Sequence, residues 1–240
     1  MEKNVSSVVR QAFIRSLPVM AGYIILGMGF GILLREAGYG VLWAFLMSAF
    51  IYAGAMQFVG VGLIKGGASV LTTALTTLMV NARHLFYSIS MVERYRNAGK
   101  FKPYLIFALT DETYTLLVED KRGEERSDGN LYRFFVSFFD HCYWIAGSVL
   151  GSLLGSIIPF STKGIEFSMT ALFIASFAEQ WLSGKDRLSA FVGLACSALC
   201  VIVFGADSFL VSDMIIITVI LTLLRGRMPG EGKEIDRDGK

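Results

Sequence analysis

Residues 16–34 read SLPVMAGYIILGMGFGILL, an apolar stretch without one charged side chain. An α-helix needs ~20 such residues to cross the hydrocarbon core of a bilayer, and this stretch approaches that length. Uncharged runs of similar or greater length cover residues 37–64, 66–82 and 188–206. The first run ends in Leu34-Arg35-Glu36 without a small-x-small cleavage site, so we interpret it as a retained helix rather than a signal peptide. The sequence therefore predicts an all-α membrane protein.

The composition agrees with a membrane protein. Hydrophobic residues make up 54% of the 240 residues and charged residues 18%, against ~25% charged residues in typical soluble domains. Mean hydropathy is +0.56. The net charge of +2 is too small to indicate nucleic acid as a partner. The 3 cysteines form no CxxC or Cys/His pattern, so we expect neither a metal ion nor a cofactor.

Hydropathy predicts about eight membrane segments, and hence a polytopic helical protein. Residues 1–16 would form a cytoplasmic N-terminal segment, residues 17–224 the membrane domain and residues 225–240 a cytoplasmic tail. Pro18 is interpreted as part of the first turn of the first helix. The predicted segments are 17–34, 41–64, 68–92, 104–118, 131–158, 165–182, 188–205 and 208–224.

The distribution of Lys and Arg predicts the orientation, because positively charged loops resist translocation. Basic residues precede the first segment and follow the last, which places both termini in the cytoplasm. With eight full crossings the basic loop 93–103 would lie outside, against this rule. If segments 68–92 and 104–118 form a broken or re-entrant pair, the loop returns to the cytoplasmic side. Both topologies stay open at this point.

A weak internal repeat relates residues 48–54 to residues 170–176 at an offset of about 122 residues, with Gln57 matching Glu179. The repeats would cover residues 17–118 and 131–224. Transporters are often built from two such halves with the substrate site between them. Chance similarity between apolar helices is the alternative explanation.

Glycine is frequent in the predicted helices. Gly27 and Gly31 form a G-x-x-x-G pair, and Gly147, Gly151 and Gly155 continue the same spacing in a later segment. Small residues allow helix backbones to approach closely in a membrane, which favours a packing role. The alternative is that Gly27, Gly29 and Gly31 loosen the first helix beside a substrate path.

Polar residues inside the apolar segments are the sharper signal, because a charge near the centre of an inserted helix costs ~2.5–3.5 kcal/mol. Structural ion pairs and snorkelling side chains are the alternative to function. Arg83 has the fork geometry to hold a substrate carboxylate, and Asn81 could bind the amino-acid head group. Residues of this kind are Arg83, Asp111, Glu112, Asp140, His141 and Glu179; the candidate proton carriers are His84, Asp111, Glu112 and Glu179.

The motifs together resemble those of the AzlC-like family. They are Tyr52-Ala53-Gly54-Ala55-Met56-Gln57-Phe58, Asn81-Ala82-Arg83-His84-Leu85-Phe86-Tyr87, Leu109-Thr110-Asp111-Glu112-Thr113-Tyr114 and the segment 164–173. Glu166 stands where aspartate is often expected, so a charge at a helix start is its safer interpretation. With the resemblance, the candidate substrate contacts are Gly27, Gly31, Gly54, Gln57, Asn81 and Arg83.

The resemblance implies the large subunit of a bacterial inner-membrane exporter of leucine, isoleucine, valine and methionine, with a small hydrophobic AzlD-like subunit as partner. Export would draw on protons or the membrane potential, because no G-x-x-x-x-G-K-[ST] motif is present. A channel, a transporter of another small metabolite and a purely structural subunit are alternatives. An intramembrane enzyme is disfavoured, since the 2 histidines accompany no G-x-S-x-G motif.

Overall fold

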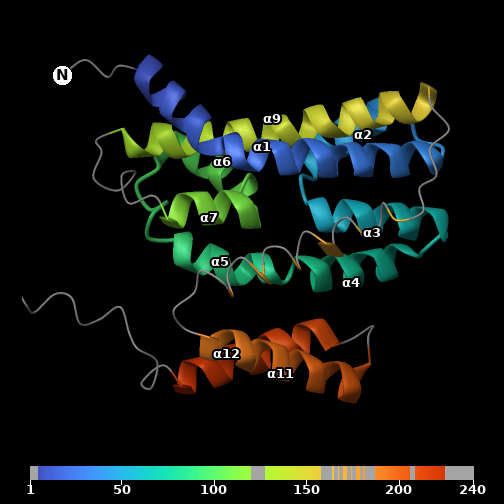
Figure 1. Cartoon of the computed structure of the whole chain (residues 1–240), viewed down its shortest axis with the longest axis vertical. Coiled ribbons are helices and arrows are strands. Elements are labelled where there is room, and N and C mark those ends of the chain that lie inside the picture. Colours follow the sequence, from blue (N-terminus) through green and yellow to red (C-terminus); the bar gives the residue numbers. More distant parts are fainter. Residues whose placement is uncertain are drawn as a thin grey trace, which may run out of the picture. The chain divides into compact units, whose positions relative to one another are not determined.

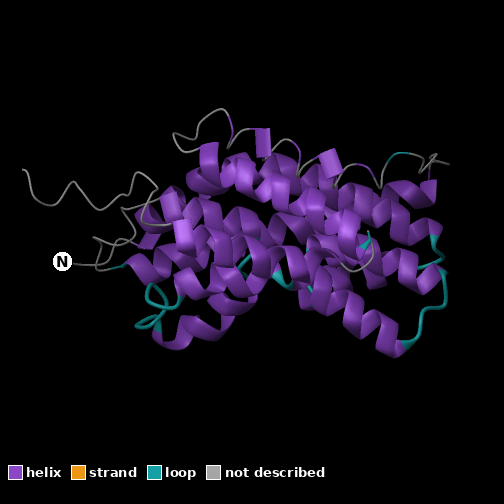
Figure 2. Cartoon of the chain, turned by 90° about the horizontal axis from the view of Figure 1, so that it is seen from below, coloured by secondary structure: helices purple, strands orange, loops and turns teal. Residues whose placement is uncertain are grey.

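The computed structural model describes residues 5–119, 128–157, 164, 167, 170–171, 174, 177–178, 181, 187–205 and 209–224. Throughout this part of the chain every regular element is a helix, as Figure 2 shows, and the predicted all-α class is confirmed. The chain divides into two compact units, Met1–Thr170 and Ala171–Lys240.

Two long helices form the frame of the first unit. Helix α1 (Val5–Glu36) and helix α9 (Gly129–Ile157) lie side by side along most of their length (Figure 1, blue and yellow). Helix α1 is long and apolar enough to cross a membrane by length and composition. It begins well before the predicted segment 17–34, and Pro18 lies inside it. The expectation that Pro18 marks the first turn is therefore wrong, because the residues before it also pack as helix against the first unit.

Glycines make the contact between α1 and α9 unusually close. A Cβ atom on Gly147 would lie 2.7 Å from the carbonyl oxygen of Ile24, and one on Gly151 would overlap the carbonyl oxygen of Met28. From the other side, a Cβ atom on Gly31 would lie 2.6 Å from the amide nitrogen of Ser152. Only residues without a side chain fit at such distances, which is the packing role that G-x-x-x-G spacing predicts.

Short helices fill the stretch between α1 and α9. Residues 41–64, predicted as one segment, form two helices, α2 (Val41–Phe50) and α3 (Gly54–Lys65). The single-segment prediction is wrong because Tyr52 takes a left-handed backbone conformation, with φ at 45°, which an α-helix cannot contain.

The predicted interruptions at 68–118 have counterparts in the structure. Helices α4 (Val70–Asn81) and α5 (Arg83–Met91) meet at Ala82, where the backbone stays in the right-handed helical region. A 3₁₀ turn (Gly99–Phe101) leads into α6 (Lys102–Phe107), and α7 (Asp111–Glu119) follows after a break. Asp111 and Glu112 thus lie in the first turn of a helix, where the helix dipole favours negative charge.

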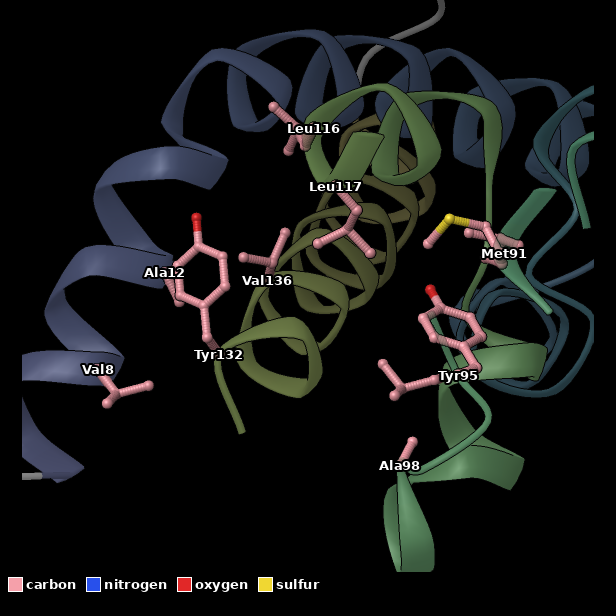
Figure 3. Close-up of a cluster of buried hydrophobic side chains, with 11 residues drawn as sticks. Val8, Ala12, Met91, Tyr95, Ala98, Leu116, Leu117, Tyr132 and Val136 are labelled. Atoms are coloured by element: carbon pink, nitrogen blue, oxygen red, sulfur yellow. The ribbon is translucent and has the colours of Figure 1, made fainter. Parts of the chain in front are cut away.

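A cluster of buried apolar side chains forms the hydrophobic core at one end of the first unit (Figure 3). It joins the start of α1 and the start of α9 to the end of α7 and to the loop after α5. At the same end, Arg15 Nη2 donates to the Leu116 carbonyl oxygen at 3.4 Å and Arg94 Nη1 to that of Leu117 at 2.7 Å. These arginines satisfy carbonyl groups at the C-terminal end of α7. The residues of the apolar cluster that Figure 3 labels are Val8, Ala12, Met91, Tyr95, Ala98, Leu116, Leu117, Tyr132 and Val136.

The second unit contains helices α11 (Arg187–Phe204) and α12 (Phe209–Leu224), which pack against each other. Gly205, with φ at 75°, follows α11. Within this pair the Ser197 hydroxyl donates to Asp213 Oδ2 at 2.5 Å. Most of the predicted segment 165–182, with Glu166 and Glu179, lies outside the described residues. The internal repeat stays a prediction.

Candidate functional site

A cavity of about 330 Å³ lies among α2, α3 and α4, within the range of ~300–1,000 Å³ that small-molecule sites occupy. Helices α3 and α4 are neighbours in the first unit (Figure 1). The walls of the cavity are mostly apolar and none of its lining residues is charged. Those residues are Met47, Ile51, Met56, Gln57, Gly60, Leu63, Ile64, Ala68, Thr73, Thr77 and Asn81.

Asn81 lines the cavity and carries a buried polar atom without a partner among the described residues. Its Oδ1 atom is buried and makes no hydrogen bond to any described residue. The hydroxyl hydrogens of Thr73 and Thr77 are already used, because each donates to the backbone carbonyl four residues earlier, at 3.0 and 2.7 Å. A buried acceptor without a partner is unfavourable, so a ligand that donates a hydrogen bond would stabilise Asn81.

Gln57, by contrast, is held in a network of protein hydrogen bonds. Trp144 Nε1 on α9 donates to Gln57 Oε1 at 2.9 Å, and Gln57 Nε2 donates to the Ser48 hydroxyl at 3.3 Å. Ser48 in turn donates to the Ser148 hydroxyl at 2.8 Å. Gly54 packs beneath the same indole ring, and a Cβ atom there would lie 3.2 Å from it. This network fixes α3 against α9 and orients the amide at the cavity wall.

Arg83 forms an ion pair with Asp111, with Nη1 2.7 Å from Oδ2. Both side chains are about one-third exposed, at 30% and 33%. The pair links the start of α5 to the start of α7. His84 beside it donates through Nδ1–H to the carbonyl oxygen of Asn81 at 3.1 Å, and its ring lies 5.0 Å from that of Tyr87. Arg83, His84 and Asp111 are thus together, but they do not line the cavity.

Glu112 belongs to a third polar group, deeper among α1, α7 and α9. The Tyr23 hydroxyl donates to Glu112 Oε2 at 2.7 Å and lies 2.6 Å from the Thr110 hydroxyl. Thr110 donates to Thr113 at 3.1 Å, and Thr113 donates to Asp140 Oδ2 at 2.8 Å. Asp140 is completely buried. The sequence marks Asp140 as an intramembrane charge without indicating its role, and nothing in the sequence connects Asp140 with Thr113.

His141, next to Asp140 on α9, contacts residues at the break between α2 and α3. Its Nε2 faces the Ser48 carbonyl oxygen at 3.1 Å and its Nδ1 faces the Tyr104 hydroxyl at 3.1 Å. Because a carbonyl oxygen only accepts, Nε2 carries the hydrogen of a neutral ring and Nδ1 accepts from Tyr104. The ring also lies against that of Tyr52, with centroids 4.3 Å apart and the ring planes tilted by 34°. These contacts stabilise the left-handed conformation of Tyr52.

The predicted site residues therefore separate into distinct groups. Gln57 and Asn81 line the cavity, Arg83 and Asp111 pair beside His84, and Glu112 joins Tyr23. Gly27 and Gly31 lie against α9, where packing accounts for both. Glu179 lies outside the described residues.

The sequence matches the family model described as AzlC protein over residues 18–158, more than half of the chain. The chain belongs to the AzlC family. It is 40% identical over 216 residues to the branched-chain amino acid transport protein AzlC of Bacillus subtilis (strain 168), covering 90% of this chain and 85% of that protein. All three polar groups and the cavity lie within the residues that match the family model.

Other relatives in the AzlC comparison are named as membrane proteins. An uncharacterized membrane protein of Haemophilus influenzae (strain ATCC 51907 / DSM 11121 / KW20 / Rd) is 40% identical over 220 residues, 91% of this chain and 90% of that one. The inner membrane protein YgaZ of Escherichia coli (strain K12) is 30% identical over 166 residues, 67% of this chain and 68% of that one. No solved structure matches the chain significantly.

Proposed function

We propose that this chain is the large subunit of a secondary transporter that exports branched-chain amino acids across the bacterial inner membrane. Membership of the AzlC family and the name of the Bacillus subtilis relative support the substrate class. The observation that carries the proposal is the apolar cavity with the unpartnered Asn81 amide oxygen at its wall. The protein would act as a transporter and not as an enzyme, with an AzlD-like small subunit as partner.

The cavity suits an aliphatic amino acid. Apolar walls would take up a leucine, isoleucine, valine or methionine side chain through the hydrophobic effect. The substrate ammonium group would donate to Asn81 Oδ1, which has no other partner among the described residues. Arg83, two residues further along, would hold the carboxylate after exchanging Asp111 for it. The exchange needs movement of Arg83, because it does not line the cavity in this conformation.

The basic residues support an orientation with the amino-terminal end of α1 in the cytoplasm. The apolar cluster brings the loop after α5 to the same end of the first unit as the start of α1. Arg94, Arg96 and Lys100 between α5 and α6, and Lys102 at the start of α6, then lie at the end that carries Arg10 and Arg15. The positive-inside rule assigns this end to the cytoplasm and favours the broken-pair topology for residues 68–118. Basic residues after α12 favour a cytoplasmic carboxyl terminus as well.

Efflux of radiolabelled amino acids tests the substrate. Bacteria loaded with leucine-containing or valine-containing peptides should release leucine and valine faster when they carry this chain and its small subunit, while lysine release should not change. If leucine and valine leave no faster with both subunits present, the proposal is wrong.

Arg83→Ala tests the carboxylate role in the same assay. Loss of a charged hydrogen-bonding group of this kind removes ~1.5–3 kcal/mol, so efflux should fall by roughly tenfold or more with normal membrane insertion. Arg83→Lys should recover only part of the efflux, because lysine lacks the bidentate fork. Arg96→Ala is the matched control, since Arg96 pairs with Glu93 on the exposed loop, with 68% of its side chain exposed. Unchanged efflux in Arg83→Ala would show that Arg83 does not hold the substrate carboxylate.

A further inference from the structure

Two acidic residues in the first unit are joined by an unbroken series of hydroxyl groups. In order, the series is Glu112, Tyr23, Thr110, Thr113 and Asp140, with oxygen–oxygen distances of 2.7, 2.6, 3.1 and 2.8 Å. We call Tyr23, Thr110 and Thr113 the hydroxyl chain. It connects α1, α7 and α9, and every distance is in or near the range of O–H···O hydrogen bonds.

The number of hydrogen atoms decides the charge of this series. Three hydroxyls carry three hydrogens, but there are four contacts to fill. If both carboxyls are ionised, Thr113 donates to Asp140 and Tyr23 to Glu112, and the single hydrogen of Thr110 can fill only one of its two contacts, to Tyr23 or to Thr113. One contact of the series would then be left without a hydrogen. One additional proton on either carboxyl fills all four contacts.

The surroundings of Asp140 agree with a protonatable site. Its side chain is completely buried, and its Oδ1 atom has no hydrogen-bond partner among the described residues. No lysine or arginine of the described residues lies within ion-pair distance of either Asp140 or Glu112. Asp111, which precedes Glu112 in the sequence, is paired with Arg83. A buried, unpaired carboxylate is strongly unfavourable. The titratable and charged groups that face the series are Asp111 and Arg83 beside Glu112, and Tyr52, Tyr104 and Tyr143 around Asp140, with His141 adjacent along α9.

We propose that Glu112 and Asp140 form a single proton-binding site that shares one proton through the hydroxyl chain and carries it during transport. Nothing in the sequence comparison assigns such a site. The proposal makes the proton the coupling ion of the proposed exporter. The role of this proton in transport rests on that proposed function, but its presence on Glu112 and Asp140 does not.

The proton can move from Glu112 to Asp140 through the hydroxyl chain. With the proton on Glu112, its carboxyl donates to Tyr23, Tyr23 donates to Thr110, Thr110 to Thr113 and Thr113 to Asp140. Moving the proton to Asp140 breaks one O–H bond and forms one at each of the four oxygen–oxygen contacts, and every hydrogen bond reverses its direction. Glu112 becomes ionised, Asp140 becomes neutral, and the hydroxyls regain their starting composition. Glu112, beside the partly exposed Arg83–Asp111 pair, is the end nearer to water.

Infrared spectroscopy of the purified full-length protein in detergent tests the shared proton without any substrate. At neutral pH the wild type should show the C=O stretching band of one protonated carboxyl. Asp140→Asn should lose the whole band, because the new amide donates the fourth hydrogen and Glu112 becomes ionised. Glu112→Gln should lose it for the same reason. Absence of the band in the wild type, or a loss of only half of it in each variant, would overturn the single shared proton.

Transport in proteoliposomes containing both subunits tests the role of the site. Thr113→Val keeps both carboxyls and breaks the hydroxyl chain, so leucine-driven proton movement should fall by roughly tenfold or more, while leucine–leucine exchange continues. Thr113→Ser restores the hydroxyl and should restore proton movement. Thr115→Val on the exposed side of α7, whose hydroxyl donates to the Asp111 carbonyl oxygen at 3.0 Å, is the control.

The outcomes separate the two proposals. Leucine exchange without proton movement in the wild type, or movement driven by sodium, overturns the coupling role of Glu112 and Asp140. Failure of leucine exchange itself overturns the proposed substrate, and the infrared result then still decides whether the shared proton exists. Equal proton movement in Thr113→Val and Thr113→Ser would overturn the hydroxyl chain as the route.

Discussion

The two long helices and the stretch between them are built on opposite principles. Helices α1 and α9 run without interruption for 32 and 29 residues and touch through glycines. Between them, residues 41–119 form only short elements, none of which exceeds 12 residues. A helix of that length spans ~18 Å, well short of the ~30 Å hydrocarbon core. No short helix could therefore cross the core alone.

The difference shows where polar chemistry can reside in such a protein. An unbroken helix satisfies its own backbone groups and leaves little for a ligand, whereas a break frees backbone and side-chain groups at depth. The cavity lies beside the break after α2, and Asp111 and Glu112 begin the helix that follows another break. Asp140 lies on α9 but faces Thr113 on the broken side. The frame positions these groups, and the interrupted stretch supplies most of them.

The largest expected effect comes from breaking the frame. Gly151→Ala would place a methyl group against the carbonyl oxygen of Met28, and neither helix backbone can yield without separating from the other. Overpacking costs ~1–3 kcal/mol where side chains can adjust, and a clash with backbone should exceed that range. We expect little or no folded protein, measured as the monodisperse yield in detergent and the midpoint of thermal unfolding.

Gly22→Ala is the matched control for this prediction. Gly22 lies on the same helix α1, but a Cβ atom there has no neighbour within 4 Å. Alanine is also the better helix former, so Gly22→Ala should be neutral or slightly stabilising. Equal yields for Gly151→Ala and Gly22→Ala would show that the close glycine contact does not hold the frame together.

The long helices were largely predictable from the sequence, and the break between α2 and α3 was not. Hydropathy predicted α9, α11 and α12 to within two residues at both ends, but α1 only at its end and not at its start. The break at residues 51–53 carries no such signal, because Ile51-Tyr52-Ala53 is apolar and contains neither proline nor glycine. It depends on tertiary contacts of Tyr52, including the ring of His141 some ninety positions away in the chain, and hydropathy cannot register such a contact.

A more selective effect should come from filling the cavity. Gly60 lines it, and a Cβ atom there meets no heavy atom within 4 Å, so Gly60→Leu can enter the empty space without disturbing the fold. Leucine efflux should fall by about tenfold, because a methylene or two in a hydrophobic site changes specificity by ~1–3 kcal/mol. Valine efflux should fall less, since the smaller side chain needs less room.

Gly62→Leu tests whether position 60 acts through the cavity. Gly62 lies on the same helix α3, is exposed, has open space at its Cβ position and does not line the cavity. Its leucine and valine efflux should match those of the wild type. If Gly62→Leu lowers leucine efflux as much as Gly60→Leu does, the cavity is not the substrate site.

The candidate site was predictable in its residue types but not in its connections. Asn81, Arg83, Asp111 and Glu112 interrupt apolar sequence, and their cost in a membrane marked them. Threonine and tyrosine cost much less there, so Thr113 and Tyr23 gave no signal even though they join the acidic residues. Pairing across helices depends on which faces meet, which one sequence does not contain.

The smallest effect should appear where the frame and the interrupted stretch are joined. Trp144→Phe keeps an aromatic ring against Phe30, which stacks on the indole, but removes the Nε1 donor to Gln57 Oε1. The buried amide oxygen is then unpaired, at a cost of ~1–3 kcal/mol. We expect a folded protein with a lower thermal midpoint and leucine efflux reduced only a few-fold. Trp43→Phe is the control, because Trp43 is 52% exposed and its ring contacts that of Tyr39.

An equal fall in the thermal midpoint for Trp144→Phe and Trp43→Phe would mean that the hydrogen bond to Gln57 does not tie α3 to α9. A loss of efflux in Trp144→Phe as large as in Gly60→Leu would be more informative. It would mean that the orientation of Gln57 matters to the cavity as much as the space inside it does. The short helices would then depend on α9 for the placement of their polar groups as well as for support.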